Sequence, residues 1–486
     1  MASLMFYLSA TVLFAQSTVA FNCSKAPIYV DIHKRAVHGS AVFQYGSFIG
    51  VGNAAQNNSL WPSLSKNHTS FAGGSYCNTK DTTLKDCITS TGGFFDADQS
   101  STFHEDKGFK ALDSDSNSTF TAIYGHDDVH LYTHYFETDG ASATNVTNTT
   151  IAVAQDGSIT PAIVGLGLDS TLLQDLFTQN TIAGKTYSLY IGQGFDRASG
   201  AVNGSNVFGG YDAGRFTGPV HKYDMTLDQG ESPLRLRVKD IVVTDNANPN
   251  TNVSLLDKGK FSNTTTTDFV AEITTDQFPL SLPYDVTQNF MKQLNAKEDN
   301  TWGDNSLMLN DAFDGTLSIV LDDGFVVTIP SEVLVNKSNI TPIQKRDEDS
   351  TAPFYLSAAF LSQVYLMMDY ESYSFYLAEA VQKNNAVMPV TFCPKATPVA
   401  YEKPSNGAWV KQGLIGAVIG GVLGGLGLAI TAYCFVLGCR RRRAEKKLER
   451  ELEKGKQAKM AQMEIEEAPE FDPPPKSATP FFWKKR

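Results

Sequence analysis

Three histidines occur at intervals of four residues, at His126, His130 and His134. Alternate side chains of a strand share one face, so these histidines would lie on the same face as Asp128 and Tyr132. Zinc accepts histidine and aspartate as ligands. The first and last histidine would nevertheless be ~27 Å apart on an extended strand, which is too far for one ion. The pattern therefore favours an exposed polar strand, and we expect neither a metal ion nor another cofactor.

Four of the six cysteines precede a long apolar segment near the C-terminus, at Cys23, Cys77, Cys87 and Cys393. An even number in an oxidising compartment suggests two disulfides, for which three pairings exist. Cys77 and Cys87 enclose a short loop, so we expect them to pair, and Cys23 and Cys393 would then bracket the folded region.

Eleven Asn-X-Ser/Thr motifs lie before the apolar segment and none lies after it. This segregation agrees with a secretory route and predicts a glycoprotein. The acceptors are Asn22, Asn57, Asn67, Asn117, Asn145, Asn148, Asn203, Asn252, Asn263, Asn336 and Asn339.

Two dibasic pairs are candidate processing sites. We favour a place in the first strand for Lys34-Arg35, although cleavage there would leave a short piece attached through Cys23. Lys345-Arg346 lies in a charged loop, where cleavage would produce a two-chain form.

The two ends of the chain predict its topology. Residues 1–20 contain a short apolar stretch that closes on small residues, as in a signal peptide. Residues 413–439 are uncharged over 27 positions, enough to cross ~30 Å of hydrocarbon as a helix. Arginines at 440–443 then predict a type I protein of the plasma membrane or an endomembrane of the secretory pathway, with its C-terminus in the cytosol. Gly416, Gly420 and Gly424 are spaced as in self-associating spans, although glycine is common in membrane helices.

The charge of the chain divides at the same point. The 486 residues carry a formal net charge of −12. Residues 440–486 contain 14 Lys+Arg against 9 Asp+Glu, whereas residues 1–439 contain 26 against 43. This acidic balance argues against nucleic acid as a partner, and the 42% hydrophobic content excludes wholesale disorder.

Short alternating apolar runs separated by Gly, Asn and Asp turns predict a mostly-β fold. Residues 317–330 have the pattern of a hairpin around Asp322-Asp323-Gly324. Helical patterns are few, at residues 170–177 and 286–294. A β-rich region of this length is more compatible with two lobes than with one sandwich.

Several segments resemble pepsin-like aspartic proteases of the fungal type. The resemblance rests on the order and spacing of residues 92–103, 123–125, 161–167, 187–192, 207–212, 216–219, 360–370 and 375–378. It implies a bilobal fold with an N-terminal lobe at 21–208 and a C-terminal lobe at 209–393. A juxtamembrane linker at 394–412, the transmembrane helix at 413–439 and a cytosolic tail at 440–486 would follow. Tyr124 matches the tyrosine of the family's flap, the hairpin that closes over the cleft.

The family's catalytic motifs are missing. The resemblance implies two Asp-Thr/Ser-Gly loops whose aspartates share one proton. No Asp in this chain precedes Thr-Gly or Ser-Gly, and residues 36–80 contain no Asp or Glu. Counting along the segments places Ser63 and Thr274 at the aspartate positions, with Asp276 as a residual carboxylate.

We therefore expect no catalytic dyad. The expected protein is a catalytically silent, protease-like membrane glycoprotein that binds or senses peptide, protein or cell-wall ligands. Because a fold does not determine a function, a glycosylated spacer domain without a ligand is the other interpretation of the same silent scaffold. The alternative is an active membrane-anchored aspartic endopeptidase with an atypical site.

Overall fold

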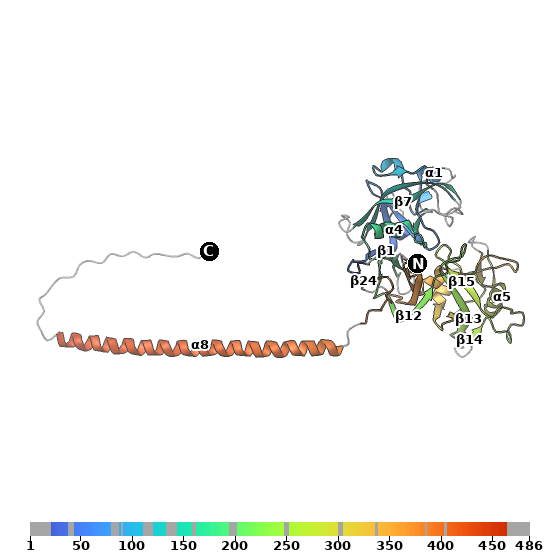
Figure 1. Ribbon diagram of the computed structural model, residues 1–486. Coiled ribbons are helices and arrows are strands. Elements are labelled where there is room, and N and C mark those ends of the chain that lie inside the picture. Colours follow the sequence, from blue (N-terminus) through green and yellow to red (C-terminus); the bar gives the residue numbers. More distant parts are fainter. Residues whose placement is uncertain are drawn as a thin grey trace, which may run out of the picture. The chain divides into compact units, whose positions relative to one another are not determined.

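The computed structural model describes residues 21–36, 43–78, 87–88, 91–109, 120–132, 143–157, 162–193, 202–246, 252–299, 305–335, 339–383, 386–402 and 406–463. The chain divides into two compact units, one ending at Tyr401 and the other beginning at Glu402. The first unit is mostly β, as the sequence predicts, and the second contains one long helix (Figure 1).

Strands are the main regular elements of the described part of the first unit. They are β1 (Ile28–Ala36), β2 (Phe43–Val51), β3 (Gln56–Ser63), β4 (Thr69–Ala72), β5 (His104–Glu105), β6 (Phe120–Tyr132), β7 (Ala143–Gly157), β8 (Ile163–Gly165), β9 (Thr186–Tyr190), β10 (Gly204–Phe208), β11 (Gly210–Asp212), β12 (Phe216–Asp224), β13 (Arg235–Asp245), β14 (Asn252–Ser254), β15 (Phe269–Ile273), β16 (Ala296–Glu298), β17 (Ser306–Leu309), β18 (Gly315–Leu321), β19 (Val326–Pro330), β20 (Ile340–Gln344), β21 (Tyr355–Leu356), β22 (Val364–Asp369), β23 (Ser374–Ala380) and β24 (Pro389–Thr391).

The helices of this unit are short. They are α1 (Gly74–Asn78), the 3-10 helix η1 (Ala97–Gln99), α4 (Thr171–Thr178), α5 (Tyr284–Leu294), α6 (Ser331–Leu334) and α7 (Ala358–Leu361). The two longest, α4 and α5, coincide with the two helical patterns predicted from the sequence. Ser170 begins α4 because its side chain accepts a hydrogen bond from the Leu173 backbone amide.

One large sheet joins distant parts of the chain. Its thirteen strands have the order β12-β23-β22-β9-β10-β1-β2-β3-β8-β4-β7-β6-β5, and β2 also pairs with β6. A six-stranded sheet contains the order β19-β18-β13-β15-β21, with β14 paired to β13. The predicted hairpin is confirmed as β18 and β19, since Val320 pairs with Val326 across the turn. The boundary between lobes at 208 and 209 stays a prediction.

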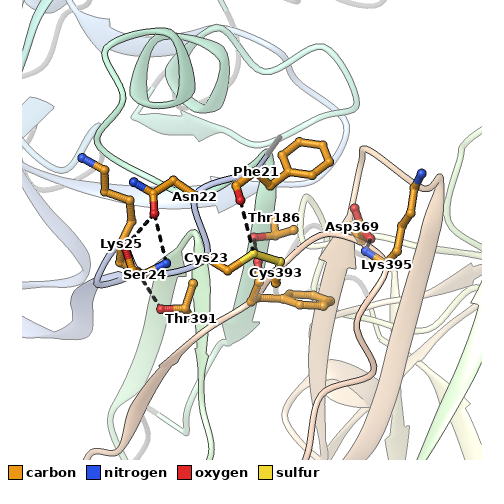
Figure 2. The surroundings of a disulfide bond; sticks show 11 residues. Phe21, Asn22, Cys23, Ser24, Lys25, Thr186, Asp369, Thr391, Cys393 and Lys395 are labelled. Carbon is orange, nitrogen blue, oxygen red and sulfur yellow. Dashed lines mark hydrogen bonds between the residues drawn. A yellow bond between two sulfur atoms is a disulfide. The ribbon is translucent and has the colours of Figure 1, made fainter. Parts of the chain in front are cut away.

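Both disulfides form in the pairing expected from the sequence, Cys77–Cys87 and Cys23–Cys393. Figure 2 shows that Cys23–Cys393 joins the start of the described chain to the segment after β24. Nearby, the Thr391 hydroxyl donates to the Lys25 carbonyl at 2.6 Å. The backbone amide of Lys395 donates to the Asp369 carboxylate at 2.7 Å.

The structure favours a structural role for both dibasic pairs. Lys34 and Arg35 lie in β1, paired with Tyr45 and Gln44 of β2, so the first-strand interpretation is confirmed. Arg346 is only 7% exposed. Its guanidinium donates to the Ser281 hydroxyl and to the carbonyls of residues 350, 352 and 353, and it stacks over the Phe354 ring. The second pair is therefore built into its loop, because protease binding after Arg346 would require these contacts to open.

The second unit contains α8 (Asn406–Met463), a helix of 58 residues. It begins seven residues before the predicted span and continues through the charged segment after it. Within it, Gly413–Lys459 is long and apolar enough to cross a membrane by length and composition. The predicted signal peptide lies outside the described residues.

Candidate functional site

Two loops from distant parts of the sequence meet at the candidate site. One begins where β3 ends at Ser63, and the other follows the end of β15 at Ile273. The Leu64 backbone amide donates to the Thr275 hydroxyl at 3.2 Å. The Trp61 indole donates to the Thr275 carbonyl at 2.8 Å. These two hydrogen bonds fix the loops against each other and position the side chains between them.

The Asp276 carboxylate lies at the centre of this contact. Its Oδ1 accepts a hydrogen bond from Ser63 Oγ at 2.6 Å. Its Oδ2 accepts from Ser65 Oγ at 2.5 Å and from Thr274 Oγ1 at 3.3 Å. Ser63 and Thr274, the two residues at the expected aspartate positions, therefore bind the same carboxylate.

Burial differs sharply among these groups. Ser63 has no exposed surface and Thr274 is 7% exposed, whereas Asp276 and Ser65 are exposed to solvent. In the described part of the chain, no hydrogen bond joins Asp276 to a second carboxylate. A shared-proton mechanism needs two facing carboxyl groups, and a hydroxyl without a proton acceptor is a poor general base. The arrangement provides one carboxylate held by three hydroxyl donors.

A pocket of about 450 Å³ adjoins this cluster. Its walls come from both halves of the first unit and include Tyr45, Trp61, Ile191, Asp276 and Phe278. Asp276 is the one charged side chain among the described residues that line it. The volume falls within the range of small-ligand sites, which are mostly apolar with a few placed polar groups. The pocket is therefore suited to a ligand with an apolar group, which would occupy the pocket, and an adjacent polar group, which would contact Asp276.

A family model described as eukaryotic aspartyl protease matches residues 72–380. This chain belongs to the eukaryotic aspartyl protease family. It is also similar to Aspartic proteinase 3 of Saccharomyces cerevisiae, with 23% identity over 342 residues. That alignment covers 64% of this chain and 55% of the yeast protein, so the chain spans about half the length of the curated relative it matches.

In this member of the aspartyl protease family, Tyr124 lies in an aromatic cluster with Phe109 and His68. Its ring stacks on Phe109 with centroids 4.5 Å apart and contacts His68 edge-on at 5.5 Å. Tyr124 is not among the described residues that line the pocket. Its predicted role in a flap stays a prediction.

The histidines on β6 have protein partners. His130 Nδ1 lies 2.8 Å from Asn145 Oδ1, and its Nε2 lies 2.9 Å from the Gly52 carbonyl. His126 Nδ1 lies 3.4 Å from the Thr150 hydroxyl. In the described ranges, no group of three potential ligands is placed to hold a metal ion. His134 lies outside those ranges.

The predicted glycosylation sites differ in exposure. Asn22, Asn145, Asn148, Asn252, Asn263 and Asn339 are exposed, and Asn57 and Asn203 are partly exposed. Asn67 is the exception, since it is only 4% exposed and its Oδ1 accepts a hydrogen bond from the Asp169 amide. The folded structure therefore disfavours a glycan at Asn67. Asn117 and Asn336 lie outside the described residues.

The residues that join the two loops were not identified from the sequence. Ser65, Thr275 and Trp61 were not predicted as site residues, and Asp276 was considered only as a residual carboxylate. The usable signal was the position of Thr275 between the two predicted site residues Thr274 and Asp276. The partners of these contacts are 211 to 214 residues apart, so local spacing alone does not predict them.

Proposed function

We propose that this chain is a catalytically silent member of the aspartyl protease family that binds ligands through its pocket. The observation that carries the proposal is the single carboxylate at the meeting of the two loops. Asp276 accepts hydrogen bonds from Ser63, Ser65 and Thr274, where a shared-proton mechanism needs a second carboxylate. The family-model match, which begins at residue 72, includes the Thr274 loop but not Ser63.

The ligand we propose is a peptide or protein segment, or a cell-wall component, with an apolar group. Trp61 and Phe278 supply aromatic surface to the pocket, and Phe278 is 51% exposed. Exposed aromatic side chains beside a concave apolar surface are typical of binding sites.

We further propose a single-pass type I glycoprotein of the plasma membrane or secretory endomembranes. The segregation of the Asn-X-Ser/Thr motifs and the arginines at 440–443 support this orientation. Gly416, Gly420 and Gly424 are the proposed contact between two copies within the membrane.

Proteolysis tests the proposed silence. The full chain, purified in detergent, is incubated with a reduced and alkylated protein from acidic to neutral pH, with and without a pepstatin-like inhibitor. We expect no inhibitor-sensitive cleavage from the wild type and no difference from Asp276→Asn. Cleavage that the inhibitor blocks and Asp276→Asn abolishes would instead establish the endopeptidase.

Binding tests the pocket separately. A library of unstructured peptides is screened for retention on the immobilised full chain, comparing the wild type with Phe278→Ala. Tyr401→Ala is a matched control because Tyr401 is a similarly exposed aromatic residue, at 47%, and does not line the pocket. We expect retention to fall at least threefold for Phe278→Ala only. Equal retention by all three proteins would reject a pocket ligand.

A further inference from the structure

The basic residues of α8 are concentrated where the apolar segment ends. Residues 440–447 contain six Lys+Arg and one Glu, a net charge of +5. Residues 448–463 contain four Lys+Arg and three Glu, a net charge of +1. The whole stretch is one helix, so each position has a defined distance along its axis.

These basic side chains surround the helix. An α-helix has 3.6 residues per turn, so the four consecutive arginines at 440–443 point in all directions around the axis. Lys446 and Lys447 extend this basic collar, defined here as residues 440–447, by a further turn. A helix that lies flat on a membrane instead carries its basic residues on one face and apolar residues on the other. The collar therefore fits a helix that passes through a layer of negative charge.

Distance separates the collar from the later basic residues. At 1.5 Å per residue the collar covers ~10 Å beyond Arg440, about one Debye length at physiological ionic strength. Arg450, Lys454, Lys456 and Lys459 lie ~15–29 Å beyond Arg440 on the same axis. Basic residues attract anionic lipid only near the surface, so the collar and the later residues should differ strongly in lipid binding.

We propose that the collar is a binding site for anionic phospholipid headgroups at the membrane face where α8 leaves the bilayer. The proposal rests on the proposed membrane span but not on the catalytic silence of the first unit. Six cationic side chains around one helix would hold several headgroups, with the long arginine stems along apolar surface and the guanidinium groups among the phosphates.

The chain offers a matched pair of variants. The first replaces Arg442, Arg443, Lys446 and Lys447 by Gln, and the second replaces Arg450, Lys454, Lys456 and Lys459 by Gln. Each removes four positive charges from the same helix, and both retain Arg440 and Arg441 next to the span. Protease protection of the tail in microsomes checks the orientation independently.

The test measures lipid preference of the full chain in bilayers of phosphatidylcholine containing a minor fraction of spin-labelled phosphatidylserine. We expect the preference for phosphatidylserine to fall at least fivefold (~1 kcal/mol) in the first variant, and by less than twofold in the second. High salt should abolish the wild-type preference. An equal fall in both variants, or a wild type without preference, would overturn the proposal. A reversed orientation with an intact preference would contradict the proposed topology and leave the lipid site standing.

Discussion

At the scale of single residues, Asp276 determines what chemistry the candidate site can perform. Spacing in the sequence placed Ser63 and Thr274 at the two positions where the family needs aspartate, and showed that residues 36–80 contain no carboxylate. It did not predict that both hydroxyls would bind Asp276. The hydrogen bond between Ser63 and Asp276 joins residues 213 apart. It depends on how the two loops pack through Thr275. The types of residue were therefore readable from sequence, whereas their geometry was not.

Substitution of Ser63 tests this geometry. Ser63→Asp would place a second carboxylate beside Asp276 in a fully buried position. Two such groups cannot both ionise, so the pair would have a raised pKa in the folded state. The folded protein must then retain a proton that the unfolded chain releases. The resulting loss of unfolding free energy therefore grows as the pH rises above ~4. We expect a loss of about 1–3 kcal/mol of unfolding free energy at pH 7 and a smaller loss at pH 4.

Ser63→Asn is the control, because it adds similar volume without charge. Thermal unfolding of the three proteins at both pH values gives the comparison. Equal losses of unfolding free energy in Ser63→Asp and Ser63→Asn, at both pH 7 and pH 4, would contradict the contact between residue 63 and Asp276.

At the scale of elements, the two longest helices of the first unit and one hairpin were the most predictable features. The α4 and α5 helices and the β18–β19 hairpin coincide with sequence patterns because their signals are local, such as the Ser170 cap. The role of Arg346 was not predictable, since its partners include Ser281, which is 65 residues away. A dibasic pair in a sequence does not reveal whether its arginine is free or built into a loop.

The start of α5 provides a test at this scale. Burial opposes ionisation of Asp285, but hydrogen bonds from Thr266 and Thr265 hold its pKa below the ordinary value of 3.8. A lowered folded pKa contributes stability above the unfolded value, and this contribution is lost as the pH falls through the folded value. Asp285→Asn should therefore cost ~1 kcal/mol at pH 7, allowing for solvent screening, and progressively less below pH ~4.

Chemical denaturation from pH 7 to pH 3 measures this difference. Asp257→Asn serves as the control, because an amide oxygen can replace its local hydrogen bond to the Gly259 amide. A constant difference between wild type and Asp285→Asn across this range would show that the charge at position 285 does not stabilise the loop.

At the scale of the whole molecule, one sheet combines strands from both ends of the first unit. The late strands β22 and β23 lie between β9 and β12, so residues near 370 complete a sheet that β1 and β2 also join. The mostly-β class was predictable from composition and alternation. The strand order was not, since it depends on pairings between segments far apart in the chain.

The long disulfide reinforces this closure. Cys23 and Cys393 are 370 residues apart, whereas Cys77 and Cys87 are 10 apart. In the chain-entropy account, a longer closed loop restricts the unfolded state more. We expect Cys23→Ser with Cys393→Ser to lower the free energy of unfolding by about 2–5 kcal/mol. Cys77→Ser with Cys87→Ser should lower it by less, and denaturant unfolding of both variants under oxidising conditions measures the two losses. Equal losses would indicate that loop length does not govern the effect.

The same bond determines which cuts could release this protein from a membrane. The chain between Cys23 and Cys393 forms a covalent ring, and α8 follows that ring in the sequence. A single cut inside the ring therefore opens it and leaves every fragment joined to α8 until the disulfide is reduced. Shedding of the intact first unit under oxidising conditions requires a cut between Cys393 and the apolar part of α8, so the short segment at 394–412 would control whether the protein remains anchored or becomes secreted.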